Sequence, residues 1–182
     1  MGRIIVLSGP SGSGKNTVYE GLLKLDKSIA QTVSATTRSP RNGEENGIDY
    51  YFISKEDFEN RIENGDFIEY NRYGENYYGT LKSEVKRLSD EHKTVVLIID
   101  VNGALNFRKI FPSAVLIFLL PPSEEVLKHR LSSRATDTEE AIQKRLDIAK
   151  EEMKFADKYD YRVVNAELDK CICEVYEIIN NI

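Results

Sequence analysis

The sequence predicts one α/β domain in which helices flank a parallel β-sheet. Short runs of β-branched and apolar residues alternate with helical patterns along most of the 182 residues. These runs are continuous rather than alternating, as in strands buried on both faces of a sheet. Hydrophobic residues make up 41% of the chain and charged residues 30%, which is ordinary for a globular protein with a buried core.

Four buried strands are predicted for this sheet, at residues 3–8, 94–100, 114–120 and 161–164. The helix after the first strand is expected at residues 17–25. The last helix is expected at residues 167–180, where apolar residues recur at helical spacing and form one stripe. The stripe consists of Leu168, Ile172, Val175 and Ile179.

Residues 34–82 have a different pattern and are predicted to form a lobe inserted into the core. Short strands are expected at residues 49–53 and 67–73. Between them, Ser54 with Asp57 three residues later is a capping-box pattern that predicts the start of a helix. The core is assigned to residues 1–33, 83–132 and 146–182, and a short lid to residues 133–145.

Composition also excludes several classes of protein. The net charge of −5 argues against a large basic surface for nucleic acid. No apolar run reaches the roughly 20 residues that a membrane helix needs. The N-terminal apolar run, Ile4 to Leu7, is shorter than that of a signal peptide, so we expect a cytoplasmic protein. The sequence leaves open whether it is a monomer or a homo-oligomer.

The strongest local motif is a glycine-rich loop between the first strand and the first helix. It reads Gly9, Pro10, Ser11, Gly12, Ser13, Gly14, Lys15, Asn16, Thr17. Glycines allow backbone N–H groups to surround phosphate oxygens, and the helix N-terminus favours negative charge. Lys15 supplies a mobile positive charge for the β- and γ-phosphates. The motif therefore predicts a nucleoside triphosphate site, although the pattern expects Ser or Thr where Asn16 stands.

Several longer motifs follow this loop in a fixed order. They are SATTRSPRNGE at residues 34–44, GIDYYF at 47–52, FIEY at 67–70, NYYGT at 76–80, IDVNGA at 99–104 and YDY at 159–161. Together with the loop and the helix that carries Arg130 and Arg134, they resemble the guanylate kinase family over essentially the whole chain. The resemblance implies a P-loop NTPase-type fold and an enzyme that moves the γ-phosphoryl group of ATP to GMP, giving ADP and GDP.

The lobe carries groups suited to the GMP phosphate. Arg38 and Arg41 flank the rigid Pro40 and can clasp a phosphate bidentately. The hydroxyls of Tyr50 and Tyr78 would complete the phosphate site.

Guanine selection is assigned to a second group of residues in the lobe. Glu69 is an acceptor-only carboxylate, which suits the N1–H and N2–H donors of guanine but has no matching pair in adenine. The hydroxyls of Ser34 and Thr80 can donate to guanine O6. For Tyr51 and Tyr77 we expect packing on a small sheet.

A second basic group lies near residues 130–145. Arg130 and Arg145 have no carboxylate three or four residues away on their predicted helices, which suggests a phosphate ligand between them. Within the lid, the segment 133–138, which includes Arg134, would bring these arginines in. The family resemblance implies that they contact the donor and acceptor phosphates, and that Asn165 lies near adenine.

Three sets of site residues are therefore predicted. The catalytic set is Lys15, Arg41, Arg130, Arg134 and Arg145. The ATP set is Gly9, Ser11, Gly12, Ser13, Gly14, Lys15, Asn16, Thr17, Arg130, Arg134 and Asn165. The GMP set is Ser34, Arg38, Arg41, Tyr50, Glu69, Tyr78, Thr80, Asp100 and Arg145.

The expected cofactor is Mg²⁺, with ATP as the phosphoryl donor. Many family members carry an acidic residue where this chain has Ile98. Asn16 and Ile98 are thus two positions near the expected metal that both depart from the usual pattern. Asn16 is the candidate ligand through its amide oxygen, directly or through a water, and Thr17 is a weaker one. Asp100 directly follows an apolar run, and phosphate-loop enzymes place a carboxylate for the metal at this position. The alternative is that Asp100 contacts the guanine.

Two other functions remain open at this stage. Guanylate-kinase-like domains also occur as protein-binding modules that have typically lost the intact phosphate loop, whereas Lys15 and the loop glycines are present here. A related small-molecule kinase with another phosphorylated acceptor is the second alternative. The guanine set of Ser34, Glu69 and Thr80 argues against it.

Overall fold

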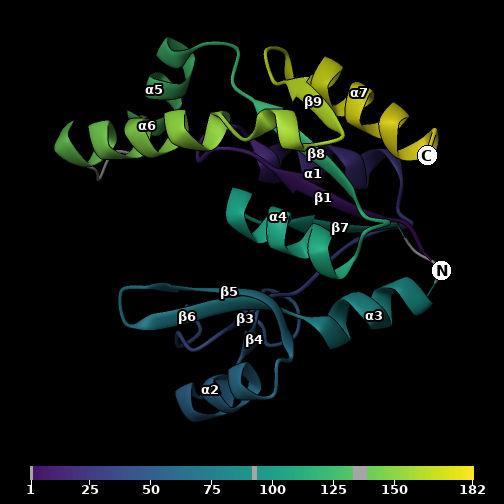
Figure 1. The fold of residues 1–182 in the computed structure, drawn as a ribbon, viewed down its shortest axis with the longest axis vertical. Coiled ribbons are helices and arrows are strands. Elements are labelled where there is room, and N and C mark those ends of the chain that lie inside the picture. The colour runs from purple at the N-terminus through teal and green to yellow at the C-terminus, as the bar shows by residue number, and fades with distance from the viewer. Residues whose placement is uncertain (1, 92–93, 133–138) are drawn as a thin grey trace.

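A five-stranded parallel sheet forms the centre of the computed structural model, which describes residues 2–91, 94–132 and 139–182 (Figure 1). Its strand order is β2-β7-β1-β8-β9, and every neighbouring pair is parallel. The strands are β1 (Ile4–Ser8), β2 (Ile29–Gln31), β7 (Thr94–Ile98), β8 (Val115–Leu120) and β9 (Tyr161–Val164). The predicted parallel sheet is therefore confirmed.

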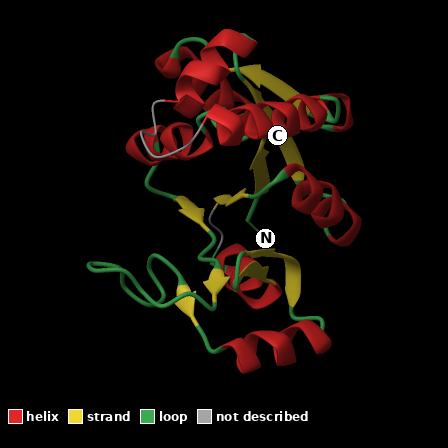
Figure 2. Cartoon of the chain, turned by 90° about the vertical axis from the view of Figure 1, so that its left-hand side faces the viewer, coloured by secondary structure: helices red, strands yellow, loops and turns green. Residues whose placement is uncertain are grey.

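Both faces of this sheet are covered, which explains the continuous apolar runs (Figure 2). Along β1, Val6 faces one cluster with Val85, Leu97 and Phe107. That cluster includes residues of α3 (Lys82–Asp90) and α4 (Val101–Ile110). Ile5 and Leu7, which alternate with Val6, belong to the opposite cluster with α1 (Lys15–Leu25) and α7 (Leu168–Asn180). Each strand thus packs on helices with both sets of side chains.

Two further helices pack against each other near the carboxyl end of β8. They are α5 (Glu124–Ser132) and α6 (Glu139–Met153), joined by a cluster of Leu127, Leu131, Leu146 and Ala149. A short 3-10 helix, η1 (Ala156–Lys158), leads into β9. Residues 133–138 of the predicted lid lie outside the described residues, and residues 139–145 form the first half of α6.

The lobe contains a second sheet below the core in Figure 1, with strand order β4-β3-β6-β5. Its strands are β3 (Ala35–Thr36), β4 (Tyr51–Phe52), β5 (Phe67–Tyr73) and β6 (Asn76–Leu81). Helix α2 (Lys55–Glu63) packs on it through Phe58, whose ring is 4.2 Å from that of Phe67. As predicted, Ser54 caps this helix, because its hydroxyl accepts the Asp57 backbone N–H at 3.0 Å.

Several elements differ from the sequence prediction. The strand expected at residues 94–100 ends at Ile98, because Asp100 already caps α4 by accepting the Gly103 N–H at 2.7 Å. Helix α1 begins at Lys15 rather than residue 17, with Gly14 as its N-cap. The strand expected at residues 49–53 is only the two-residue β4. The strands β2, β3 and β6 were not predicted, since none has a continuous apolar run.

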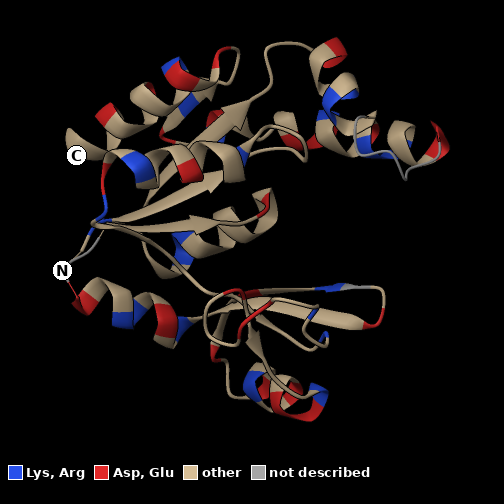
Figure 3. Cartoon of the chain, turned by 180° about the vertical axis from the view of Figure 1, so that it is seen from behind, with Lys and Arg blue, Asp and Glu red and all other residues tan. Residues whose placement is uncertain are grey.

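Charged residues of both signs are interspersed over the outer helices, as Figure 3 shows. Within the described ranges, every helix is too short or too polar to span a bilayer.

Candidate active site

The loop between β1 and α1 depends on glycine at positions that no other residue could occupy. Gly14 has φ 94°, and a Cβ atom there would lie 2.4 Å from Asn165 Nδ2. A Cβ atom on Gly9 would lie 2.3 Å from the Leu119 carbonyl oxygen. Asn165 also donates its side-chain amide to the Ser13 carbonyl at 2.8 Å. The loop is thus held rigidly against the ends of β8 and β9.

Lys15 folds back over this loop. Its Nζ atom donates to the carbonyl oxygens of Gly9 at 2.7 Å and Pro10 at 3.0 Å. Two cavities open on either side of the loop, and both are lined by Ser11 and Lys15. A group bound in either cavity would therefore lie beside the same ammonium.

The first cavity has a volume of about 560 Å³ and lies over the N-terminus of α1. It is lined by Ser11, Gly12, Gly14, Lys15, Asn16, Thr17, Arg130, Asn165, Ala166 and Leu168. All but Ala166 and Leu168 belong to the set predicted for ATP. Asn165 is only 4% exposed, and its amide is occupied by the loop, so it supports the cavity wall as well as lining it.

The second cavity, of about 510 Å³, lies between the core and the lobe. It is lined by Gly9, Ser11, Lys15, Ser34, Tyr50, Glu69, Asn71, Tyr78, Gly79, Ile98, Ile99, Asp100 and Glu152. Five residues of the predicted GMP set are thereby brought together, although they come from segments far apart in the sequence.

Two arginines reach the loop from the helices above it. Arg130, near the end of α5, donates Nη2 to the Asn165 carbonyl at 2.9 Å. Arg145 on α6 donates Nη2 to the Ser11 hydroxyl at 2.9 Å. Arg145 thus contacts the loop itself, and Arg130 contacts Asn165, which supports the loop. Arg134, the third predicted arginine, lies outside the described residues.

Glu152 is a site residue that the sequence analysis missed. It lies on α6 seven residues after Arg145, which is two helical turns and the same face, and that spacing could have revealed it. Burial raises the pKa of the Glu152 carboxyl, the Lys15 ammonium lowers it, and Asp100 raises it again. The Glu152 carboxyl group and the Lys15 ammonium thus line the same cavity.

In the lobe, Glu44 binds the segment that carries both predicted phosphate arginines. Its Oε1 accepts from Arg38 Nη2 at 2.8 Å, and its Oε2 accepts the Arg41 backbone N–H at 2.6 Å. Arg38 holds the pKa of Glu44 below its ordinary value, so this carboxylate stays ionised at neutral pH. The Arg38 guanidinium also lies over the Tyr50 ring, 5.5 Å from its centroid. An anion in the cavity would compete with Glu44 for this arginine.

Glu69 and Thr80 are opposite each other on β5 and β6, after a register shift between Phe67 and Glu69. The Thr80 hydroxyl donates to Glu69 Oε1 at 2.8 Å, so its proton is directed to this carboxylate rather than to a purine oxygen. Burial raises the pKa of Glu69, the Thr80 hydroxyl lowers it, and Asp100 raises it. In this structure Thr80 supports Glu69, and its predicted contact with guanine O6 stays a prediction.

Asp100 is fixed by both the core and the lobe. Besides capping α4, it accepts the side-chain amide of Asn71 at 2.6 Å. Asn71 was also missed, although it follows Glu69 by two residues on β5 and so shares its face of the strand.

The two tyrosines that we expected only to pack do so, and the hydroxyl of each also contacts a glutamate. Tyr51 and Tyr77 both pack against the lobe cluster around Phe58. The Tyr51 hydroxyl also donates to Glu84 at 3.0 Å.

Comparisons with known proteins agree on one family. A family profile described as guanylate kinase matches residues 1–182. The chain is 47% identical to a guanylate kinase of Halalkalibacterium halodurans, over 98% of this chain and 87% of that one. It is 45% identical to one of Rickettsia felis, over 98% and 93%. Among solved structures, the guanylate kinase of Anaplasma phagocytophilum matches with TM-score 0.75 and 33% identity, over 99% of this chain and 85% of that one.

Proposed function

The chain belongs to the guanylate kinase family and is an ATP:GMP phosphotransferase, and we propose that ATP binds in the first cavity and GMP in the second. The observation that supports this division is that Ser11 and Lys15 line both cavities. Phosphoryl transfer would then occur beside Lys15, where the two cavities meet. The alternatives, a protein-binding module and a kinase for another acceptor, are not favoured by the family.

On the GMP side, Glu69 would accept the guanine N1–H and N2–H, with Thr80 behind it holding the carboxylate in place. Ser34 would donate to O6. Arg38 would exchange Glu44 for the GMP phosphate, together with Arg41, Tyr50 and Tyr78. Exchanging one anion for another would keep Arg38, which is half-buried, paired in both states.

On the ATP side, the backbone N–H groups of the loop would hold the β- and γ-phosphates at the N-terminus of α1. Arg130 and Arg145 reach this loop from α5 and α6 and would neutralise charge on the transferring group, together with Arg134 of the lid. We propose the same division of the chain as from sequence, with a core, the lobe at 34–82 and a lid at 133–145. Closure of the lobe and the lid would exclude water as a competing acceptor.

The reaction needs no general base. An oxygen of the GMP phosphate attacks the γ-phosphorus of ATP, and the bond to the bridging β–γ oxygen breaks, releasing ADP. The second pKa of a phosphate monoester is about 6, so the attacking oxygen is already ionised at neutral pH. Catalysis therefore consists of in-line positioning and neutralisation of charge on a loose transition state. Lys15 would supply the largest share of this neutralisation, because it lines both cavities.

We propose Mg²⁺ as the cofactor, and the residues present fit it with few protein ligands. Among the described residues, no group of three or more His, Cys, Asp or Glu side chains is placed to hold a metal. The oxygen ligands available near the loop include Asn16 and Thr17 in the first cavity and Asp100 and Glu152 in the second. Mg²⁺ retains several waters in such sites and would add positive charge beside the phosphates.

The Asn16→Ser variant is expected to keep turnover within about tenfold of wild type, roughly 1.4 kcal/mol of barrier, because the phosphates and water supply most metal ligands. The measurement is GMP-dependent ADP formation across a Mg²⁺ titration for wild type, Asn16→Ser and Asp100→Asn. Complete loss of turnover in Asn16→Ser would show instead that the amide has a dedicated role.

The lid arginine is expected to act on the transferring group. Arg134→Ala should lower kcat by more than it raises the KM for GMP, whereas Arg41→Lys should raise the KM for GMP because the bidentate fork is lost. Steady-state kinetics with each substrate varied in turn would measure both effects. An Arg134→Ala variant with normal kcat and a raised KM for GMP would contradict this assignment.

The function itself is tested by one coupled assay of ADP formation with GMP, AMP, UMP or no acceptor. We expect turnover that depends on GMP and on Mg²⁺. Turnover with another acceptor alone would favour the related-kinase alternative, and no turnover at any Mg²⁺ concentration would favour the binding module. The cytoplasmic location expected from the sequence stays a prediction.

A further inference from the structure

Glu84 is a charged residue that the proposed mechanism does not use, yet it is only 4% exposed. It lies in the first turn of α3, three residues after β6 ends at Leu81. Burial of a carboxylate is unfavourable unless hydrogen bonds and opposite charge compensate for the lost water. The groups that contact the Glu84 carboxylate must therefore stabilise its burial.

Both carboxylate oxygens of Glu84 are fully engaged. Oε1 accepts the Val33 backbone N–H at 3.2 Å and Arg87 Nη2 at 3.2 Å. Oε2 accepts the Tyr51 hydroxyl at 3.0 Å and Arg87 Nε at 3.2 Å. The two parallel contacts with Arg87 fix the plane of the carboxylate. Burial, and then the contact with Glu84, raise the pKa of Tyr51, so this hydroxyl stays protonated and available as a donor.

The partners of Glu84 belong to both parts of the molecule. Helix α3 is anchored in the core, because Val85 and Leu88 pack in the cluster beneath the parallel sheet. Tyr51, in contrast, lies on β4 of the lobe. Glu84 thus joins the core directly to the lobe sheet.

Val33 occupies the first of the two points where the chain passes between core and lobe. The preceding residue, Thr32, donates its N–H to Val96 of the core sheet at 3.4 Å. The following residue, Ser34, accepts the Tyr51 N–H at 2.9 Å within the lobe sheet. The second crossing is the step from Leu81 into α3, which carries Glu84 itself. Both crossings therefore meet at one carboxylate.

We propose that Glu84 is a positioning residue for the acceptor nucleotide, which ties both core–lobe crossings together and so sets where Ser34 and the lobe stand relative to the phosphate loop. Ser34 lines the second cavity, and its neighbour Val33 is bound by Glu84. Loss of the carboxylate would displace the guanine side of that cavity while leaving the first cavity unchanged. The inference rests on the proposed binding of GMP in the second cavity.

The test uses Glu84→Gln and Tyr51→Phe in the full chain. A glutamine can place its amide oxygen toward only one side, so either Val33 or Tyr51 loses its acceptor. Tyr51→Phe removes only the hydrogen bond from the lobe sheet to Glu84 and leaves Glu84 paired with Arg87. This variant therefore tests the proposal even if Glu84→Gln does not fold. We expect each variant to raise the KM and the calorimetric Kd for GMP by about fivefold to tenfold, with the KM for ATP within about twofold of wild type.

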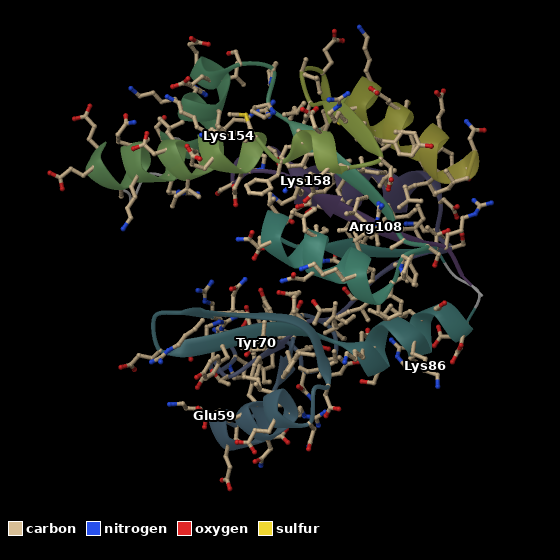
Figure 4. All side chains as sticks on the ribbon, in the orientation of Figure 1. Glu59, Tyr70, Lys86, Arg108, Lys154 and Lys158 are labelled. Atoms are coloured by element: carbon tan, nitrogen blue, oxygen red, sulfur yellow. The ribbon has the colours of Figure 1, made fainter. Side chains whose placement is uncertain are left out.

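The matched control is Tyr77→Phe. Tyr77 packs on the same lobe cluster, and its hydroxyl contacts Glu59 at 3.5 Å, a residue on α2 at the far side of the lobe from the core (Figure 4). This variant removes a tyrosine–glutamate contact that stays within the lobe, so its KM for GMP should equal that of wild type.

The outcomes separate positioning from mere stabilisation. A lower melting temperature with unchanged GMP affinity in Glu84→Gln and Tyr51→Phe would overturn the inference, and so would equal shifts for GMP and ATP. A raised Kd for GMP in Tyr51→Phe but not in Tyr77→Phe would support it. Because this Kd is measured without turnover, an inactive wild type would refute the proposed function while the Kd comparison still decides the role of Glu84.

Discussion

Replacing Lys15 with methionine is expected to lower kcat by about a hundredfold to a thousandfold, the usual effect of removing one preorganised charge from a transition state. Methionine keeps the length of the side chain but removes the ammonium that lies between the two cavities. Since that charge would contact both phosphates while the phosphoryl group is transferred, kcat should fall more than either KM rises. Steady-state kinetics with ATP and GMP varied separately would measure this.

Stability provides the control for Lys15→Met. The ammonium donates to two loop carbonyls, so its loss should change the free energy of unfolding by no more than about 2 kcal/mol. Lys24→Met makes the same substitution at an exposed position of α1 and should leave kcat unchanged. A Lys15→Met enzyme with kcat within about tenfold of wild type would remove this lysine from the centre of the mechanism.

The Glu69→Gln variant is expected to lose about tenfold to a hundredfold in kcat/KM for GMP, the value of a charged hydrogen bond of roughly 1.5–3 kcal/mol. Thr80 donates to Glu69 Oε1, so it would hold the oxygen of the new amide toward itself. The NH₂ group would then face the guanine N–H donors, which leaves one of them without an acceptor. Glu63→Gln, an exposed change on α2 of the same lobe, should have no effect.

The pH dependence of GMP binding gives an independent check on Glu69. Burial raises the pKa of this carboxyl, and only its ionised form accepts both guanine donors. As the pH falls, GMP affinity should therefore begin to fall at a higher pH than an ordinary glutamate would allow. Protonation of the GMP phosphate affects wild type and Glu69→Gln alike, so the difference between their profiles isolates the carboxyl. Identical profiles, or unchanged GMP kinetics in Glu69→Gln, would contradict its role.

Much of the core could be predicted from sequence because local patterns determine it. The continuous apolar runs of β1, β7 and β8 reflect burial on both faces, and their alternation with helical patterns favours a parallel sheet covered by helices. The phosphate loop could be recognised from the spacing of its glycines, since Gly9 and Gly14 stand where a Cβ atom would collide. The strands β2 and β3 could not, because they are two or three residues long and are held by their neighbours.

The residue types of the site were likewise evident from sequence, whereas their contacts were not. The arginines and Lys15 are suited to binding phosphates, and Glu69 is suited to binding guanine, whatever their positions in the fold. That Thr80 supports Glu69 depends on a register shift in β5, and that Glu44 binds Arg38 depends on the path of a turn. Neither detail follows from residue periodicity, because the first depends on strand register and the second on the path of the backbone.

By itself, then, the sequence determined the parallel core, the phosphate loop and the chemistry of the nucleotide-binding side chains, because these follow from periodicity and residue type. Only the tertiary structure decided that Glu152 faces Lys15, that Asn71 binds Asp100 and that Glu84 joins the core to the lobe. Each of these contacts links elements at least 29 residues apart in the chain. Polar contacts of this kind have no periodicity, so their partners are defined only once the two sheets are folded and packed.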